Sequence, residues 1–223
     1  MANKIQKMSS FKSQIEKYGN PISKEVYSEL AEYAGKRNVH LSGFKDYVGD
    51  IKVIEAVIDD ICVIAEDFPM IISGKNAIEL KLDYDMGTDF ATTKHKHIIH
   101  LNAGYYSKLE ILIRDYNVGV YEKRFVKNTD WHSVIKHEVG HVVANIYKLK
   151  PMEIAKSILN MEREIEILEY LTDELSLYST ELEDGTEIIS ESFSGYYGNA
   201  GNDFADKYVK RCIEIISEGG KQA

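Results

Sequence analysis

The sequence predicts an α+β fold in a single domain. Apolar residues recur at helical spacing near the start and over the second half of the chain, while short runs that alternate apolar and polar residues occur between them. Helices, then a small sheet, then helices is an order typical of α+β proteins. A length of 223 residues with 44% hydrophobic residues is sufficient for one sizeable core. We therefore expect one domain over residues 1–223, with a helical part over residues 1–75.

Two helices are expected before the sheet. The first should run from Pro21 to about Lys36, with the Ser23 side chain as its N-terminal cap. The second should run from Asp50 to Glu66, where apolar residues recur with a period of about 3.6 residues. Residues 1–20 are polar, and we expect them to be loosely held.

Two strands are expected next. Ile78–Tyr84 alternates with period two, Asp85–Asp89 has the composition of a turn, and Lys96–Asn102 is the second strand. The second strand is rich in histidine. Because His97 and His100 would point to opposite faces of a strand, we interpret them as surface and edge residues rather than a second metal site.

Five helices are expected after the sheet, with Asp184-Gly185 as a turn between the third and the fourth. The expected ranges are Ser107–Tyr116, Asp130–Tyr147, Met152–Tyr178, Glu187–Tyr197 and Asp203–Ser217. Together with the sheet, these helices would form a core over residues 76–223.

One of these helices contains the run His137-Glu138-Val139-Gly140-His141, which has the pattern H-E-x-x-H. Residues four apart in a helix lie on one face, so His137 and His141 can bind one metal ion from the same side. Glu138 is rotated by about 100° from His137, which places its carboxylate beside the metal, where a general base for an activated water belongs. Two imidazoles leave room for a third ligand and a water, which suits a zinc ion (Zn²⁺).

The surroundings of this motif favour a metal site over an ordinary buried helix with core histidines. The helix is apolar on most sides, so it is expected to be buried. Its apolar residues are Val134, Ile135, Val139, Val142, Val143 and Ile146. A buried helix that carried His-Glu-His without partners would leave polar groups desolvated at a large cost in free energy.

Two downstream segments offer a third ligand, and each has two acids four residues apart. Glu169 and Asp173 lie in a segment dense in charge, which is typical of a solvated helix face. Glu187 and Glu191 lie in an apolar segment, where acids tend to be buried and to need partners. The flanking residues therefore favour Glu187 as the metal ligand and Glu191 as the group that orients a ligand histidine. Glu169 is the alternative ligand.

Composition limits the partners of the chain. The net charge is −9 and no basic stripe is present, so we expect no nucleic-acid binding. No segment has the length and apolarity of a membrane span or of a signal peptide, so we expect no membrane partner and a cytoplasmic location. Cys62 and Cys212 are the two cysteines, and we expect both to be reduced core residues.

These motifs resemble the catalytic domain of anthrax toxin lethal factor and its relatives. That family has H-E-x-G-H, then a tyrosine, then E-F-F-A-E-A-F; this chain has the H-E-V-G-H run, then Tyr178, then Glu187-Ile-Ile-Ser-Glu-Ser-Phe193. Metallopeptidase domains associated with phage minor head proteins of Gram-positive bacteria are similar, and there a strand ending in H-L-N, like His100-Leu-Asn102, precedes the metal helix. The resemblance covers about residues 80–215.

The resemblance implies a zincin fold of the gluzincin type, with residues 76–223 as the catalytic core. It implies a zinc endopeptidase with His137, His141 and Glu187 as ligands and Glu138 as general base. In zincins the edge strand beside the active-site helix pairs with extended substrate. We expect the histidine-rich strand, Lys96–Asn102, to have this role towards a peptide or protein substrate.

The resemblance further implies that the Tyr178 hydroxyl stabilises the oxyanion. Because the spacing from Tyr178 to Glu187 is slightly longer than in the family, Tyr196 and Tyr197 are alternatives for this role.

The resemblance also implies a phage or prophage origin, in a bacterial or phage-infected cell or in the virion, with phage head components as partners. There are three alternatives to this endopeptidase. The first is a non-catalytic, zinc-stabilised structural or assembly protein of a phage head, the second is an intracellular, toxin-like protease with one host target, and the third is a binding module that keeps the peptide groove without turnover. Glu138 argues against the first, because a purely structural site does not need that carboxylate.

Overall fold

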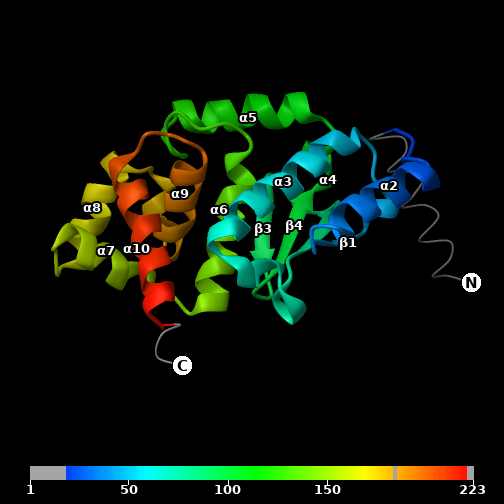
Figure 1. Ribbon diagram of the computed structural model, residues 1–223. Coiled ribbons are helices and arrows are strands. Elements are labelled where there is room, and N and C mark those ends of the chain that lie inside the picture. Colours follow the sequence, from blue (N-terminus) through cyan, green and yellow to red (C-terminus); the bar gives the residue numbers. More distant parts are fainter. Residues whose placement is uncertain (1–18, 183–184, 220–223) are drawn as a thin grey trace, which may run out of the picture.

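The computed structural model describes residues 19–182 and 185–219 and has an α+β architecture, mostly helical with a small mixed sheet (Figure 1). The strands are β1 (His40–Ser42), β2 (Glu79–Asp83), β3 (Ala91–Lys94) and β4 (Ile98–Asn102). Their order in the sheet is β1-β2-β4-β3, with β1, β2 and β4 parallel and β3 antiparallel to β4. The strand β3 therefore forms one edge of the sheet, and β4 lies inside it.

Two helices precede the central strands, as the sequence predicts. The helix α2 spans Lys24–Gly35, and the Ser23 hydroxyl accepts a hydrogen bond from the Val26 amide. The helix α3 spans Ile51–Asp67, and the Asp50 side chain accepts from the Lys52 amide at 2.9 Å. These side chains satisfy amides of the first turn that have no partner within the helix.

The remaining helices follow the sheet. They are α4 (Ala103–Tyr106), α5 (Leu109–Tyr121), α6 (Ser133–Tyr147), α7 (Pro151–Leu159), α8 (Glu164–Glu174), α9 (Thr186–Tyr197) and α10 (Asp203–Gly219). Short 3₁₀ turns cover Phe44–Asp46, Pro69–Ile72, Gly74–Asn76 and Tyr178–Thr180.

The helix α6 occupies the middle of the molecule (Figure 1). It contacts α3 and β3 towards the sheet, and it contacts α9 among the C-terminal helices. The helix α9 also packs against α7 and α10. Most residues of α6 and α9 are buried. The predicted burial of the H-E-x-x-H helix is therefore confirmed, although its residue Ile146 is only half-buried.

The prediction of one long helix over Met152–Tyr178 is wrong. The helix α7 ends at Leu159, and Asn160 has a left-handed backbone with φ of 52°, from which the chain turns back to α8. The turn allows α7 and α8 to pack against each other. A pattern of apolar residues along the chain does not reveal this break, because each half keeps its own apolar stripe.

The strand prediction is also incomplete, since β1 and β3 were not expected. The strand β3 has the sequence Ala-Thr-Thr-Lys, which does not alternate apolar with polar residues. The turn to β4 has positive φ at His95 and Lys96. Asparagine and glycine are the residues that usually indicate such a turn, so the sequence did not reveal this one. Pairing with β3 places β4 inside the sheet, so the expected edge role of Lys96–Asn102 is wrong and β3 has that position.

Other predictions have mixed outcomes. His100 is buried, with Nδ1 2.9 Å from Asp83 Oδ2, so its interpretation as a surface residue is wrong. The two cysteines are free; Cys212 is buried and Cys62 is half-buried. The expected looseness of residues 1–18 and the Asp184 part of the expected turn lie outside the described residues.

Candidate metal centre

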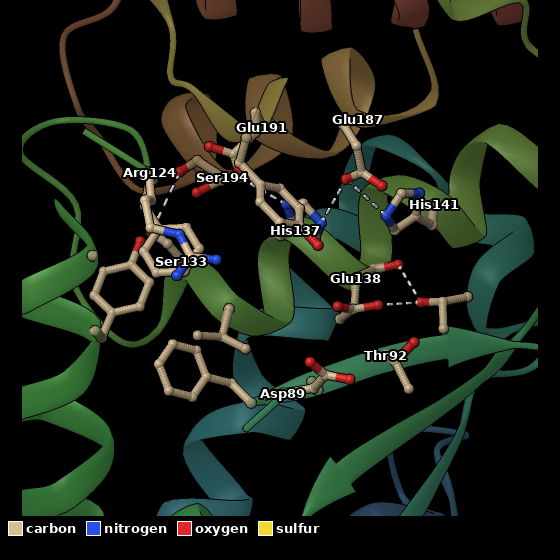
Figure 2. A pocket seen from close by; sticks show the side chains of 18 of the residues that line it. Asp89, Thr92, Arg124, Ser133, His137, Glu138, His141, Glu187, Glu191 and Ser194 are labelled. Carbon is tan, nitrogen blue, oxygen red and sulfur yellow. Dashed lines mark hydrogen bonds and ion pairs between the residues drawn. The ribbon is translucent and has the colours of Figure 1, made fainter. Parts of the chain in front are cut away.

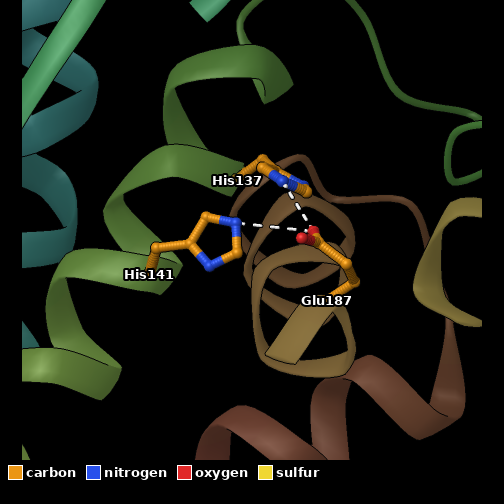
Figure 3. A group of neighbouring side chains, drawn as sticks. All are labelled: His137, His141 and Glu187. Atoms are coloured by element: carbon orange, nitrogen blue, oxygen red, sulfur yellow. Dashed lines mark ion pairs between the residues drawn. The ribbon is translucent and has the colours of Figure 1, made fainter. Parts of the chain in front are cut away.

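The structure brings His137, His141 and Glu187 together at the crossing of α6 and α9 (Figure 3). Glu187 Oε2 lies 3.2 Å from His137 Nε2 and 3.4 Å from His141 Nε2. The three potential ligand atoms all lie within 4.8 Å of one another. The two imidazoles come from successive turns of α6, as the i, i+4 spacing predicts, and the carboxylate comes from the first turn of α9.

Gly140 makes this helix crossing close enough. A Cβ atom at Gly140 would lie 2.8 Å from Ser190 Cα and 3.3 Å from the Ile189 carbonyl oxygen on α9. These neighbours are backbone atoms, which cannot rotate away. The absence of a side chain at this position therefore allows α9 to approach α6. This approach sets the distance between the acids of α9 and the histidines of α6.

The contacts of Glu187 fit a bound cation. Its Oε2 atom is buried and has no hydrogen-bond partner among the described residues, although two imidazole nitrogens face it. This buried oxygen therefore has ion-pair contacts but no hydrogen bond within the described part of the chain, and a metal ion between the three groups would give it a direct partner. Two imidazole nitrogens and one carboxylate oxygen form a donor set typical of catalytic zinc sites, which keep a further coordination position open.

Glu191 orients the first of these imidazoles. Its Oε1 lies 2.8 Å from His137 Nδ1, and its Oε2 accepts a 2.7 Å hydrogen bond from the Ser176 hydroxyl. The side chain is 1% exposed. With a proton on Nδ1 shared with Glu191, the Nε2 lone pair of His137 faces Glu187 and the metal position. The contact expected between Glu191 and a histidine of the motif is therefore present.

The electrostatics of the site also favour a positive charge. Burial alone would lower the pKa of His137, but its contacts with Glu187 and Glu191 outweigh burial and raise that pKa to about 10. Burial alone would raise the pKa of Glu187, but the imidazoles of His137 and His141 lower it to about 2. The carboxylates thus attract a cation, and a metal ion can replace the proton that His137 otherwise holds.

Glu138 lies on the neighbouring face of α6 and is directed towards β3 (Figure 2). Its Oε2 accepts a 2.7 Å hydrogen bond from the Thr93 hydroxyl. The side chain is 7% exposed, and it lines the same cavity as His137 and His141. The offset of Glu138 from His137 and His141 agrees with the rotation predicted for adjacent helical residues.

Tyr178 reaches the site through the segment between α8 and α9. Its amide donates to the Arg124 carbonyl oxygen at 3.2 Å, and its ring lies 5.5 Å from the His137 ring, centroid to centroid. Burial, together with the charge of Glu187, raises the pKa of Tyr178 above its ordinary value. The hydroxyl therefore keeps its proton at neutral pH and can act as a hydrogen-bond donor.

The two alternatives to Tyr178 are not among the residues that line the cavity. The Tyr197 hydroxyl donates to Asp67 Oδ2 at 2.8 Å. The Tyr196 ring packs edge-on against the Tyr197 ring, with 4.9 Å between centroids. These contacts give the pair a packing role at the back of α9.

The alternative third ligand, Glu169, is exposed on α8, as is its partner Asp173. Neither belongs to the group of potential metal ligands that the described residues form. The structure thus brings Glu187 to the histidines and leaves the first acid pair in solvent.

A cavity of about 610 Å³ opens in front of the histidines and Glu187 (Figure 2). Its walls come from β3, the end of α5, α6 and α9. One wall is a row of aromatic rings in contact with one another, and this row ends at His137. The rings belong to Tyr105, Phe90, Tyr116, Phe125 and Tyr178. The cavity is large enough for a segment of peptide with its side chains.

Two residues of the site were not anticipated from the sequence. Thr93 lies in the unexpected strand β3, and Ser176 lies where the long helix was expected to continue. Both contact an acid of the site through a hydroxyl group. Serine and threonine are common along the chain, so no local sequence signal distinguishes these two.

Comparisons with known proteins give no further guide: no family model matches the chain, and no curated protein and no solved structure is detectably similar to it. Within the described residues, no helix has the length and apolarity needed to cross a membrane. The geometry of the site is therefore the main basis for a functional hypothesis.

Proposed function

We propose that this protein is a zinc-dependent endopeptidase with a zincin fold of the gluzincin type. One observation carries the proposal: a carboxylate suited to be a general base, Glu138, faces the same open cavity as the group His137, His141 and Glu187. A site with a purely structural metal is typically closed by four protein ligands. Here three ligands and an adjacent acid border a space large enough for substrate.

In this proposal, His137, His141 and Glu187 hold the zinc ion, and Glu191 fixes the orientation of His137. When bound, zinc supplies a Lewis acid that polarises the scissile carbonyl and lowers the pKa of a water molecule to about 7. Glu138 accepts a proton from the attacking water and passes it to the leaving amine. The Tyr178 hydroxyl donates a hydrogen bond to the carbonyl oxygen as negative charge develops there.

The edge strand β3 supports a peptide as the substrate. The Asn102 amide donates to the Phe90 carbonyl oxygen, so Phe90 and Asn102 form a hydrogen-bonded pair. Every second residue of β3 after Phe90, namely Thr92 and Lys94, has the same orientation towards β4. Because hydrogen-bonded pairs alternate along antiparallel strands, the backbone groups of Ala91 and Thr93 point away from β4. An extended peptide can add to this edge through main-chain hydrogen bonds, with little demand on its sequence.

The decisive experiment measures cleavage of unfolded casein by the zinc-loaded protein, by Glu138→Gln and by Glu169→Gln as the matched control. We expect cleavage to stop with a chelator and to return with zinc. Glu138→Gln should bind zinc normally but lose about 10²–10⁴-fold in kcat, because the general base is removed. Glu169→Gln should behave as wild type, because that carboxylate is exposed on α8.

The same experiment separates the alternatives. One tightly bound zinc per chain without any cleavage would favour the non-catalytic, zinc-stabilised assembly protein of a phage head. Cleavage of casein at many sites would favour a general endopeptidase. Cleavage confined to one protein would favour the toxin-like protease. A phage or prophage origin, with head components as substrates or partners, rests on the resemblance of the two motifs to those of phage minor head proteins.

A further inference from the structure

A contact between Thr93 and Glu138 joins the edge strand β3 to the helix α6. Thr93 Oγ1 lies 2.7 Å from Glu138 Oε2 and 3.0 Å from the Glu138 backbone oxygen. The hydroxyl has one proton to donate, and the carboxylate is both the closer and the stronger acceptor. The Thr93 hydroxyl therefore donates to Glu138 Oε2.

We propose that Thr93 is a positioning residue that fixes the orientation of the Glu138 carboxylate. This inference rests on the proposed peptidase function, because it concerns the group assigned there as general base. The terminal torsion of a glutamate is broad, so an isolated carboxylate samples many orientations. A charge-assisted hydrogen bond to one oxygen restricts that torsion and leaves the other oxygen to accept the proton of the attacking water.

Threonine suits this position because its own side chain is held firmly. The branched Cβ restricts rotation about χ1, and the residue is half-buried between the sheet and α6. The strand β3 contacts α6 directly, so the backbone that carries the hydroxyl is held close to the helix that carries Glu138. The donor is thus ordered before any substrate binds.

The location of Thr93 links the base to the substrate. Its backbone groups face the open edge of the sheet, where an extended peptide can pair, while its side chain bonds to Glu138. A peptide that pairs with this residue is therefore aligned with respect to the carboxylate oxygen that receives the proton. In this proposal, Thr93 sets both the register of the bound peptide and the orientation of the Glu138 carboxylate.

The test compares Thr93→Val, which keeps the shape but removes the donor, with Thr93→Ser, which keeps the donor. We expect Thr93→Val to lower kcat on casein by about 10–100-fold, with little change in KM or zinc content, because the base is misplaced while substrate and metal still bind. Thr93→Ser should recover most of the activity. Thr172→Val, which removes a hydroxyl bonded to the Leu168 carbonyl on α8, is the control for a general loss of stability.

A crystal structure of Thr93→Val gives a readout that does not depend on activity. Displacement of the Glu138 carboxylate, or its spread over several orientations, supports the proposal. An unmoved carboxylate in the variant, or a kcat equal to that of wild type, overturns it. If the wild-type protein cleaves nothing, the proposed peptidase function fails on its own, and the carboxylate position in the variant still decides whether Thr93 holds Glu138.

Discussion

The helices α8 and α9 carry the same arrangement of acids but place it in opposite environments. Glu169 and Asp173 on α8 are exposed, whereas Glu187 and Glu191 on α9 are 7% and 1% exposed. Both pairs have i, i+4 spacing, so spacing alone does not distinguish them. The surroundings do: the acids of α9 face two imidazoles across a close helix crossing, and those of α8 face water. Burial opposite suitable partners, and not spacing, therefore distinguishes the two acid pairs.

The largest expected effect on zinc affinity comes from removing the first acid of the pair on α9. Glu187→Ala should weaken zinc binding by more than about 100-fold. This loss exceeds the effect typical of a residue that contacts a metal ligand but not the metal itself. The reason is the loss of one of the three proposed protein ligands. A zinc competition titration measures this change, with Glu169→Ala as the matched variant on α8. Equal affinities for the two variants would rule out the ligand role of Glu187, and a larger loss in Glu169→Ala would transfer that role to α8.

A smaller effect is expected one turn further along α9. Glu191→Ala should weaken zinc binding by about 10–100-fold, because His137 loses the acceptor that fixes its orientation. The Ser176 hydroxyl loses the acceptor of its proton in the same variant but still accepts from the Ser179 amide. Asp173→Ala on α8 should leave the affinity unchanged. An unchanged affinity in Glu191→Ala would show that packing alone orients the imidazole.

The smallest expected effect concerns the helix crossing itself. In Gly140→Ala, the gain in helix propensity of about 1 kcal/mol is opposed by overpacking against the backbone of α9, for a net loss of about 1–2 kcal/mol in the free energy of unfolding. Urea unfolding of the metal-free protein measures it. Gly35→Ala on α2 is the control, since a Cβ there meets nothing within 4 Å. A Gly140→Ala variant as stable as wild type would mean that α9 can move away freely, and zinc affinity should then reveal the displacement.

Several features could be predicted from the sequence because their cause is local. The Ser23 cap of α2, the burial of α6 and the shared face of His137 and His141 depend on residues within a few positions of one another. The preference for Glu187 over Glu169 used flanking residues as a proxy for burial. The proxy works because a helix with charges on most sides cannot be buried at low cost.

Other features were decided by tertiary structure. The strand β3 has little strand character of its own and exists because β4 pairs with it along one edge. The break at Asn160 accompanies the packing of α7 against α8, which are distinct helices only in the folded chain. The partner of Glu138 lies 45 residues away on that unexpected strand, so its identity depends on a long-range pairing.

The sequence by itself thus determined which residues can bind a metal and which helix carries them, because helical spacing fixes the directions of neighbouring side chains. Only the tertiary structure decided which residues face them. Glu187 and Glu191 face the histidines across the close contact at Gly140. Tyr178 is held near them by its hydrogen bond to the Arg124 backbone, and Thr93 contacts Glu138 from the edge strand. The physical reason is that contacts between distant segments depend on how whole elements pack. A pattern along the chain records the local propensities of those elements but not their final neighbours.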